Sequence, residues 1–226
     1  MNARANRKSF LSAFGQRPRE LAWKFFEAIV QRLAWSGGLH LYGVFSRPLG
    51  TKIEPDPVVP GYCFRMYQAG EVDTFLADSI RLKPILNEAF AKEAFGKGDV
   101  CDAITFNGEI VSFSWSAFSA THDHDGVYVE FDPRHRYAYF GFTLPEFRGN
   151  HLPRLFRSSR DRHSISRGCT HSISYISIDN RPSIRSAIGA GSSRIGFAGY
   201  FKRGSLFWVF RTGPVRRSGF RFVLSK

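Results

Sequence analysis

Cysteines and long apolar runs are scarce in this sequence. Cys63, Cys101 and Cys169 are the three cysteines among 226 residues, and they stand far apart. An odd, widely spaced set predicts reduced thiols and argues against a disulfide framework or a cysteine-based zinc site. No run reaches the roughly 18 to 20 apolar residues that span a bilayer. Because the basic start is not followed by an apolar core with a small-residue cleavage site, we expect no signal peptide and a cytoplasmic location.

Acidic residues are nearly missing from the last third of the chain. Residues 145–226 hold 16 lysines and arginines against Glu146, Asp161 and Asp179, a net charge of +13, while the rest of the chain balances to zero. A basic region of this kind favours a polyanionic partner: nucleic acid, an anionic lipid surface or a phosphorylated cofactor. Residues 41–144 have a net charge of −5, which favours a cationic amine as a second ligand.

Composition divides the chain into three parts. Residues 1–47 form a basic arm with a predicted amphipathic helix from Glu20 to Trp35. The apolar face of this helix fits packing on the rest of the chain or docking at the inner face of a membrane, and both interpretations stay open. Residues 48–61 contain four prolines and predict an extended linker. Residues 62–226 then form the main domain.

The order of elements indicates a mixed α/β fold. The pattern predicts a strand, a helical region broken at Pro84, a hairpin around Asn107-Gly108, a second antiparallel pair, a helix, a strand, a helix and two strands. A strand–helix–strand crossover near the middle predicts one parallel pair of strands in the sheet. The predicted ranges are 62–67, 72–95, 100–106 with 109–118, 127–131 with 136–144, 153–167, 171–178, 181–190, 197–202 and 206–211.

The stretch Phe142–Pro153 carries the most specific motif. It reads FTLPEFRGNHLP and resembles the acetyl-coenzyme A loop of the GNAT superfamily of acyltransferases. In the family, that loop follows the fourth strand. Its motif begins with Arg or Gln, has Gly three positions later, and has Gly or Ala two positions after that Gly. Further segments resemble the family in order: Asn180 with Ser183 opens the helix after strand five, Gly189–Gly196 matches a later Gly-Phe region, and Asn107-Gly108 the second hairpin. The resemblance covers about residues 62–212.

The resemblance implies a fold and an activity. The fold is a GNAT-type central, mostly antiparallel sheet with a parallel, splayed pair of strands, flanked by helices, here with an extra N-terminal helix. The activity is N-acyl transfer by direct attack of a primary amine on acetyl-CoA, or on another acyl-CoA, in a ternary complex without a metal.

The coenzyme site implied by the resemblance is a loop that enters a helix. Free N–H groups and the positive end of the dipole favour a diphosphate there, and Arg148 adds a charged donor. His151 stands where the family has its signature Gly, and Pro153 where it has Gly or Ala, so His151 must adopt the backbone angles of that Gly. The implied cofactor-binding residues are Phe142, Thr143, Leu144, Arg148, Gly149, Asn150, His151, Leu152, Pro153, Asn180 and Ser183.

The catalytic groups are less marked than the loop. Transfer to an amine needs a base for the ammonium and donors for the carbonyl oxygen. Glu130 and Tyr139, on the predicted central strands, are the candidate catalytic bases. His171, on the predicted strand 171–178, is a third and less favoured candidate. By resemblance, the backbone N–H groups of Thr143 or Leu144 would hold the carbonyl oxygen.

Departures from the family pattern keep a second hypothesis open: His151 and Pro153 replace the small residues of the loop, and one tyrosine is missing. The tyrosine that often protonates the departing thiolate in this family would fall at Ala187, so the general acid stays unassigned. The His122–Asp125 loop, with His124, is interpreted as a solvated polar loop because two histidines without a third ligand make a weak metal site. The alternative function is a GNAT-fold binding module without catalysis, which would use its basic C-terminal third for nucleic acid or an anionic membrane.

Overall fold

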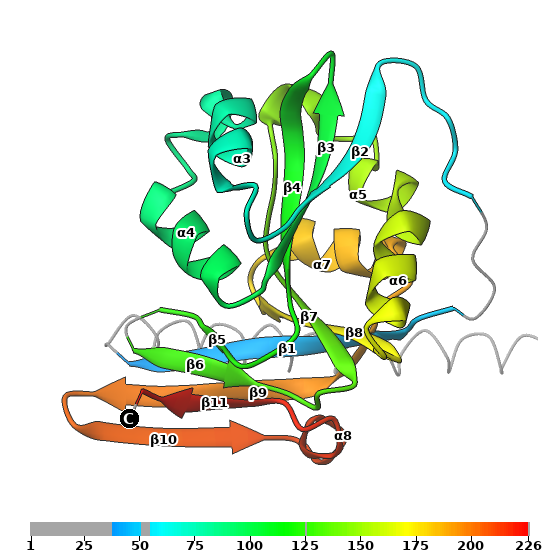
Figure 1. Cartoon of the computed structure of the whole chain (residues 1–226). Coiled ribbons are helices and arrows are strands. Elements are labelled where there is room, and N and C mark those ends of the chain that lie inside the picture. The colour runs from blue at the N-terminus through cyan, green and yellow to red at the C-terminus, as the bar shows by residue number, and fades with distance from the viewer. Residues whose placement is uncertain (1–37, 51–54, 125, 226) are drawn as a thin grey trace, which may run out of the picture.

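The computed structural model describes residues 38–50, 55–124 and 126–225, and the predicted helix Glu20–Trp35 lies outside them. Its main sheet has eight strands. They are β1 (Leu39–Pro48), β2 (Tyr62–Tyr67), β3 (Val100–Phe106), β4 (Glu109–Ala117), β7 (His135–Thr143), β8 (His171–Ser177), β9 (Ser193–Arg203) and β10 (Leu206–Arg211), in the spatial order β10-β9-β1-β8-β7-β4-β3-β2 (Figure 1). Only β7 and β8 are parallel among these neighbours. The predicted mixed sheet with one parallel pair is confirmed.

Helices cover both faces of the β2–β4 half of the sheet (Figure 1). Trp115 and Ser116 are neighbours on β4, so their side chains point to opposite faces. Trp115 packs against Phe75 and Phe95, from the helices on one face, whereas Ser116 donates to Asp102 on the other. The first face carries α3 (Val72–Asp78), η1 (Ile80–Leu82) and α4 (Glu88–Gly96), and the second carries α5 (Leu152–Leu155) and α6 (Arg157–Ser166). The short η2 (Pro145–Phe147) precedes α5, and α7 (Arg181–Gly189) and α8 (Gly213–Arg217) come later in the chain. None of the described helices is long and apolar enough to cross a membrane.

A second, three-stranded sheet packs on the main one. It contains β5 (Thr121–His122), β6 (Val127–Glu130) and β11 (Arg221–Leu224), in the order β11-β6-β5. The predicted pairing of 127–131 with 136–144 is therefore wrong, because β6 pairs with β5 and β11 instead of β7. The alternating residues Val127 and Val129 are fully buried in a core that includes Tyr137 of β7, so β6 lies over the face of the main sheet and not beside its strands.

Strand β1 lies inside the main sheet, between β8 and β9. We expected residues 1–47 to stand apart from the main domain, and the structure differs for the part of that segment from Leu39 onward. Val44 and Phe45 explain the difference: they point to opposite faces and are both buried, as expected for a central strand that is covered on both sides. The remaining division into arm, linker and domain stays a prediction.

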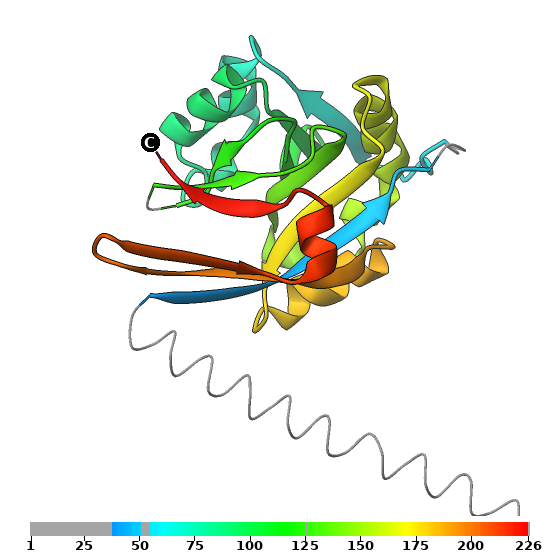
Figure 2. The same ribbon diagram turned by 90° about the horizontal axis from the view of Figure 1, so that it is seen from below.

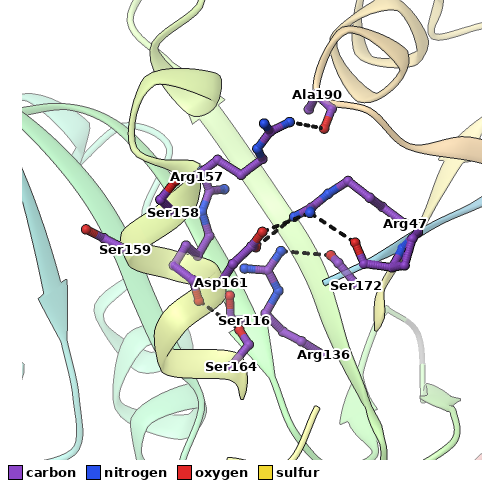
Figure 3. Close-up of polar contacts among 12 residues, drawn as sticks. Arg47, Ser116, Arg136, Arg157, Ser158, Ser159, Asp161, Ser164, Ser172 and Ala190 are labelled. Atoms are coloured by element: carbon purple, nitrogen blue, oxygen red, sulfur yellow. Dashed lines mark hydrogen bonds and ion pairs between the residues drawn. The ribbon is translucent and has the colours of Figure 1, made fainter. Parts of the chain in front are cut away.

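A buried ion pair fastens β1 to α6. The Arg47 guanidinium donates to both carboxylate oxygens of Asp161, at 2.8 Å from Nη1 and 2.7 Å from Nη2. Figure 3 shows Arg136 of β7 beside this pair, where it donates to Ser172 of β8 at 2.8 Å. Burial lowers the pKa of Arg136 to about 10. Charged and polar groups from β1, β7, β8 and α6 thus meet at one point beneath the helix.

We predict that Asp161→Ala strongly destabilises the fold. The substitution leaves Arg47 buried without its carboxylate, and breaking a buried pair in this way costs about 3–5 kcal/mol. The measurement is urea unfolding followed by circular dichroism. The control is Lys92→Ala, which removes the exposed Glu88–Lys92 pair and should leave the midpoint unchanged; equal effects of the two substitutions would contradict the assignment.

Candidate functional site

The parallel strands β7 and β8 touch only at their beginnings. They pair at His135 with His171, Arg136 with Ser172 and Tyr137 with Ile173. Beyond these positions β7 stays paired with β4, and β8 stays paired with β1. The two strands therefore diverge, and we call this break in the backbone pairing of the sheet the opening.

A bulge in β7 lies at this opening. Phe113 pairs with Phe142 and Trp115 with Tyr139, so Phe140 and one further residue of β7 stand opposite a single residue of β4. Phe140 has a φ of 42°, which is rare for an aromatic residue, and its side chain is partly exposed. Bulges bend a strand and end regular pairing, and they recur beside active sites. The bulge lies three residues beyond Tyr137, where the pairing of β7 with β8 ends.

The two backbone N–H groups implied by the resemblance, of Thr143 and Leu144, differ in whether they are already hydrogen-bonded to β4. The N–H of Leu144 donates to the carbonyl of Val111 on β4, at 2.9 Å, so it is not available for a ligand. Successive N–H groups along a strand point to opposite sides, so the N–H of Thr143 points away from β4 and toward the opening. Of the two, Thr143 remains as the candidate donor to a carbonyl oxygen.

The predicted coenzyme loop follows directly from the end of β7. Arg148, Gly149 and Asn150 are exposed, whereas Leu152 is buried and anchors the loop. Gly149 has a φ of 84°, and His151 has a φ of 53°, so His151 does adopt the left-handed conformation expected at the position of the signature Gly. The Arg148 side chain folds back over β7, where Nε donates to the carbonyl of Thr143 at 3.0 Å and the guanidinium lies 5.5 Å from the centre of the Phe142 ring.

The helix predicted from Pro153 is two helices with a break at Phe156. Asp56, from the predicted linker, accepts hydrogen bonds from the N–H groups of Ser158 and Ser159, each at 2.9 Å. A carboxylate of the chain itself thus satisfies the first turn of α6. A bound diphosphate would rely on the loop before α5 and on nearby arginines, more than on the N-terminus of the longer helix.

Asn180 occupies the position predicted from the resemblance. It is the N-cap of α7, and its Oδ1 accepts from the N–H of Ser183 at 3.2 Å. Arg157 of α6 reaches across to the end of α7, where it donates to the carbonyl of Ala190 at 3.2 Å (Figure 3). The part of Asn180, Ser183 and the loop in coenzyme binding stays a prediction.

The candidate bases have partners of their own. Glu130 forms an ion pair with Arg221 on the small sheet. The Tyr139 hydroxyl donates to Asp99 at 2.6 Å, and burial together with the Asp99 charge raises the pKa of Tyr139 well above its usual value. Tyr139 therefore stays protonated near neutral pH. His171 lies at the start of β8, with its ring 5.2 Å from that of His135. A catalytic part for Glu130 or Tyr139 stays a prediction.

The loop interpreted as solvated contains a polar cluster that the sequence alone did not show. The Tyr175 hydroxyl of β8 donates to Oδ1 of Asp123. Nδ1 of His124 lies 2.7 Å from Oδ2 of Asp123, and Nε2 lies 2.7 Å from the Tyr200 hydroxyl of β9. The side chain of Asp123 is 14% exposed and that of His124 is 40% exposed, so this carboxylate–imidazole pair is half-covered by the main sheet.

The cluster borders the opening between β7 and β8. Tyr175 lies two residues beyond Ile173, the last residue of β8 that pairs with β7. Its ring stacks on Tyr137 at 6.1 Å, and Tyr137 stacks on Tyr139 at 5.4 Å. Burial, with the neighbouring Tyr137 and Asp123, raises the pKa of Tyr175 well above its usual range. Within the described ranges, no group of three or more His, Cys, Asp or Glu side chains has the arrangement of a metal site.

A cavity of about 580 Å³ lies between α3 and α4. Apolar side chains of Leu76, Ile80 and Leu86 line it together with Lys83. It is separate from the predicted coenzyme loop, but α4 also carries Phe90, whose ring lies 5.1 Å from the Phe140 ring at the bulge.

Comparison with known proteins concerns the fold only. No family model and no curated protein matches the sequence. Among solved structures, the chain is similar to the aminoglycoside N-acetyltransferase AAC(6')-Iy in complex with CoA (15% identity, 69% of this chain, 99% of that chain, TM-score 0.44). It is also similar to a GCN5-related N-acetyltransferase from Kribbella flavida (14% identity, 73% of this chain, 60% of that chain, TM-score 0.40). A third similar structure is a tandem GNAT protein from the clavulanic acid biosynthesis pathway (13% identity, 76% of this chain, 53% of that chain, TM-score 0.48). The chain spans little more than half of the last two proteins, and no activity follows from likenesses this distant.

We predict that Arg148→Ala weakens binding of acetyl-CoA about tenfold, because a charge-assisted contact to phosphate is worth about 1.5–3 kcal/mol. Isothermal titration calorimetry measures the affinity. The matched control is Arg134→Ala, which removes an exposed arginine before the opposite end of β7 and should leave the affinity unchanged. An Arg148→Ala variant with the affinity of the wild type would exclude this loop as the phosphate site.

Proposed function

We propose that the protein is an N-acyltransferase that moves an acetyl group from acetyl-CoA to a primary amine. The observation that carries the proposal is the opening between β7 and β8, with an exposed loop of left-handed residues directly at its end. A narrow opening in a sheet fits an extended acyl thioester arm, and a loop with exposed N–H groups fits its diphosphate.

The residues of the loop and of α7 support the coenzyme part of the proposal. Gly149 and His151 both have positive φ, and a backbone that includes left-handed residues can bring successive N–H groups together around an anion. Arg148 adds a fixed positive charge. Asn180 and Ser183 begin α7 near the C-terminal end of β8. Because Oδ1 of Asn180 takes the N–H of Ser183 and Pro182 has no N–H, these residues would contribute their side-chain groups and not a free helix N-terminus.

Transfer to an amine requires three events at the opening. The ammonium first loses a proton, which we assign to the Asp123–His124 pair because Tyr175 connects that pair to the opening. The neutral nitrogen then attacks the thioester carbon, and the N–H of Thr143 stabilises the negative oxygen that forms. Finally the C–S bond breaks, the thiolate takes the second nitrogen proton to give free coenzyme A, and the imidazolium releases its proton to solvent. The net charge of −5 on residues 41–144 supports a cationic acceptor.

The proposal predicts binding and turnover with acetyl-CoA. Millimolar acetyl-CoA should raise the melting temperature, since a ligand at about 100 times its dissociation constant adds about 2.7 kcal/mol to the stability of the folded state. Thiol release measured with a panel of aminoglycosides, polyamines and lysine peptides should exceed the rate without amine. No stabilisation would contradict the enzyme proposal, whereas stabilisation without turnover of any amine would favour the binding-module alternative.

We further predict that His124→Asn lowers kcat about 100-fold while the affinity for acetyl-CoA is unchanged, since loss of a positioned base costs about 10²- to 10⁴-fold. Thiol release gives kcat, and calorimetry gives the affinity. His122→Asn is the matched control, because His122 lies two residues before His124, in β5, but its ring meets Tyr128 of the small sheet edge-on. Equal rates for His124→Asn and the wild type would remove the Asp123–His124 pair from the mechanism.

A further inference from the structure

The β9–β10 hairpin has an apolar side that faces away from the core. Phe207 and Val209 of β10 pack inward on the aromatic core. Because side chains alternate along a strand, Leu206 and Trp208 point outward. They are 59% and 61% exposed, which is high for residues of their size. Figure 2 shows the hairpin projecting from the body of the molecule.

The outward side continues across three strands. Trp208 pairs with Phe201 of β9, and Phe201 pairs with Leu39 of β1, so the three residues share one face. The Phe210 ring lies 5.6 Å from Trp208 and extends over Gly199, where an added Cβ would lie 2.3 Å from the ring. We call this surface the hairpin face; its residues are Leu39, Phe201, Leu206, Trp208 and Phe210.

Arg203 adds positive charge to the hairpin face, and the C-terminal segment as a whole is basic. Arg203 is exposed and pairs with Leu206 across the turn, so it lies on the same side of the hairpin. Arg216 and Arg217 of α8 are also exposed. The sequence contains no acidic residue after Asp179, against ten lysines and arginines. The hairpin face therefore combines exposed large apolar side chains with Arg203, within a segment of strongly positive net charge.

We propose that the hairpin face docks on the surface of an anionic lipid bilayer. Tryptophan prefers the boundary between lipid headgroups and hydrocarbon, and leucine contributes by leaving water. Nearby lysines and arginines are attracted to anionic headgroups, each more strongly at low salt. A nucleic acid fits this face less well, because Leu206 offers neither a ring for stacking nor a hydrogen bond to a base. β10 is the edge strand of the main sheet, so the hairpin can approach a flat surface without obstruction from a neighbouring strand.

The test is co-sedimentation of the full chain with vesicles, and it is independent of acetyl transfer. We expect binding to vesicles of phosphatidylcholine mixed with phosphatidylglycerol, weaker binding to phosphatidylcholine alone, and a decrease with added salt. Trp208→Ser should lower the affinity at least about tenfold, from the lost transfer of the indole alone. Val58→Ser is the matched control, because Val58 is 97% exposed in the segment before β2, and it should bind as the wild type does.

A second measurement reports on Trp208 directly. Vesicles that contain brominated lipid should quench tryptophan fluorescence of the wild type, and Trp208→Phe should remove most of that quenching. The proposal is overturned if the full chain fails to bind the anionic vesicles, if Trp208→Ser binds them as tightly as the wild type does, or if double-stranded DNA displaces the protein from the vesicles through contacts that Trp208→Ser also abolishes.

Discussion

The parting of β7 and β8 is the constraint on which the candidate site depends. Two parallel strands that remained paired would fill the middle of the sheet with backbone hydrogen bonds and leave no room for a ligand. Here the ladder ends at Tyr137 and Ile173, and the bulge at Phe140 turns β7 onto its own course with β4. The predicted coenzyme loop, the N–H of Thr143 and the Tyr175 cluster all lie along the borders of this opening.

The parting is stable because each half of the sheet has its own core. One cluster of buried side chains surrounds Trp115 on the β2–β4 half, and another surrounds Tyr200 on the half with β8, β1 and β9; Tyr139 packs against both. The halves are joined at the base of the opening, where Arg136 of β7 bonds to Ser172 of β8 and Arg47 of β1 bonds to Asp161 of α6. The polar contacts where β7 and β8 begin, together with an apolar core on either side, let these two strands diverge without loss of the fold.

Local signals were readable from the sequence, and contacts between distant segments were not. Asn107-Gly108 predicts its hairpin because both residues readily adopt the positive φ that a tight turn needs. The start of α7 at Asn180 came from the family resemblance, and the N-cap hydrogen bond of Asn180 gives it a local physical reason. β1 was missed because its partners β8 and β9 follow more than 120 residues later. The Asp123–His124 loop looked solvated because the hydroxyls that cover it come from positions 52 and 76 residues away.

The central claim is that the opening and the loop at its end hold an acyl-coenzyme A. Amide NMR during titration with acetyl-CoA tests it residue by residue, because the thioester and diphosphate oxygens shift the N–H resonances that they contact. The account predicts the largest shifts at Thr143, Gly149 and His151, with amides of β10 unchanged. Large shifts confined to the basic residues after Asp179, with Thr143 and the loop unaffected, would contradict it.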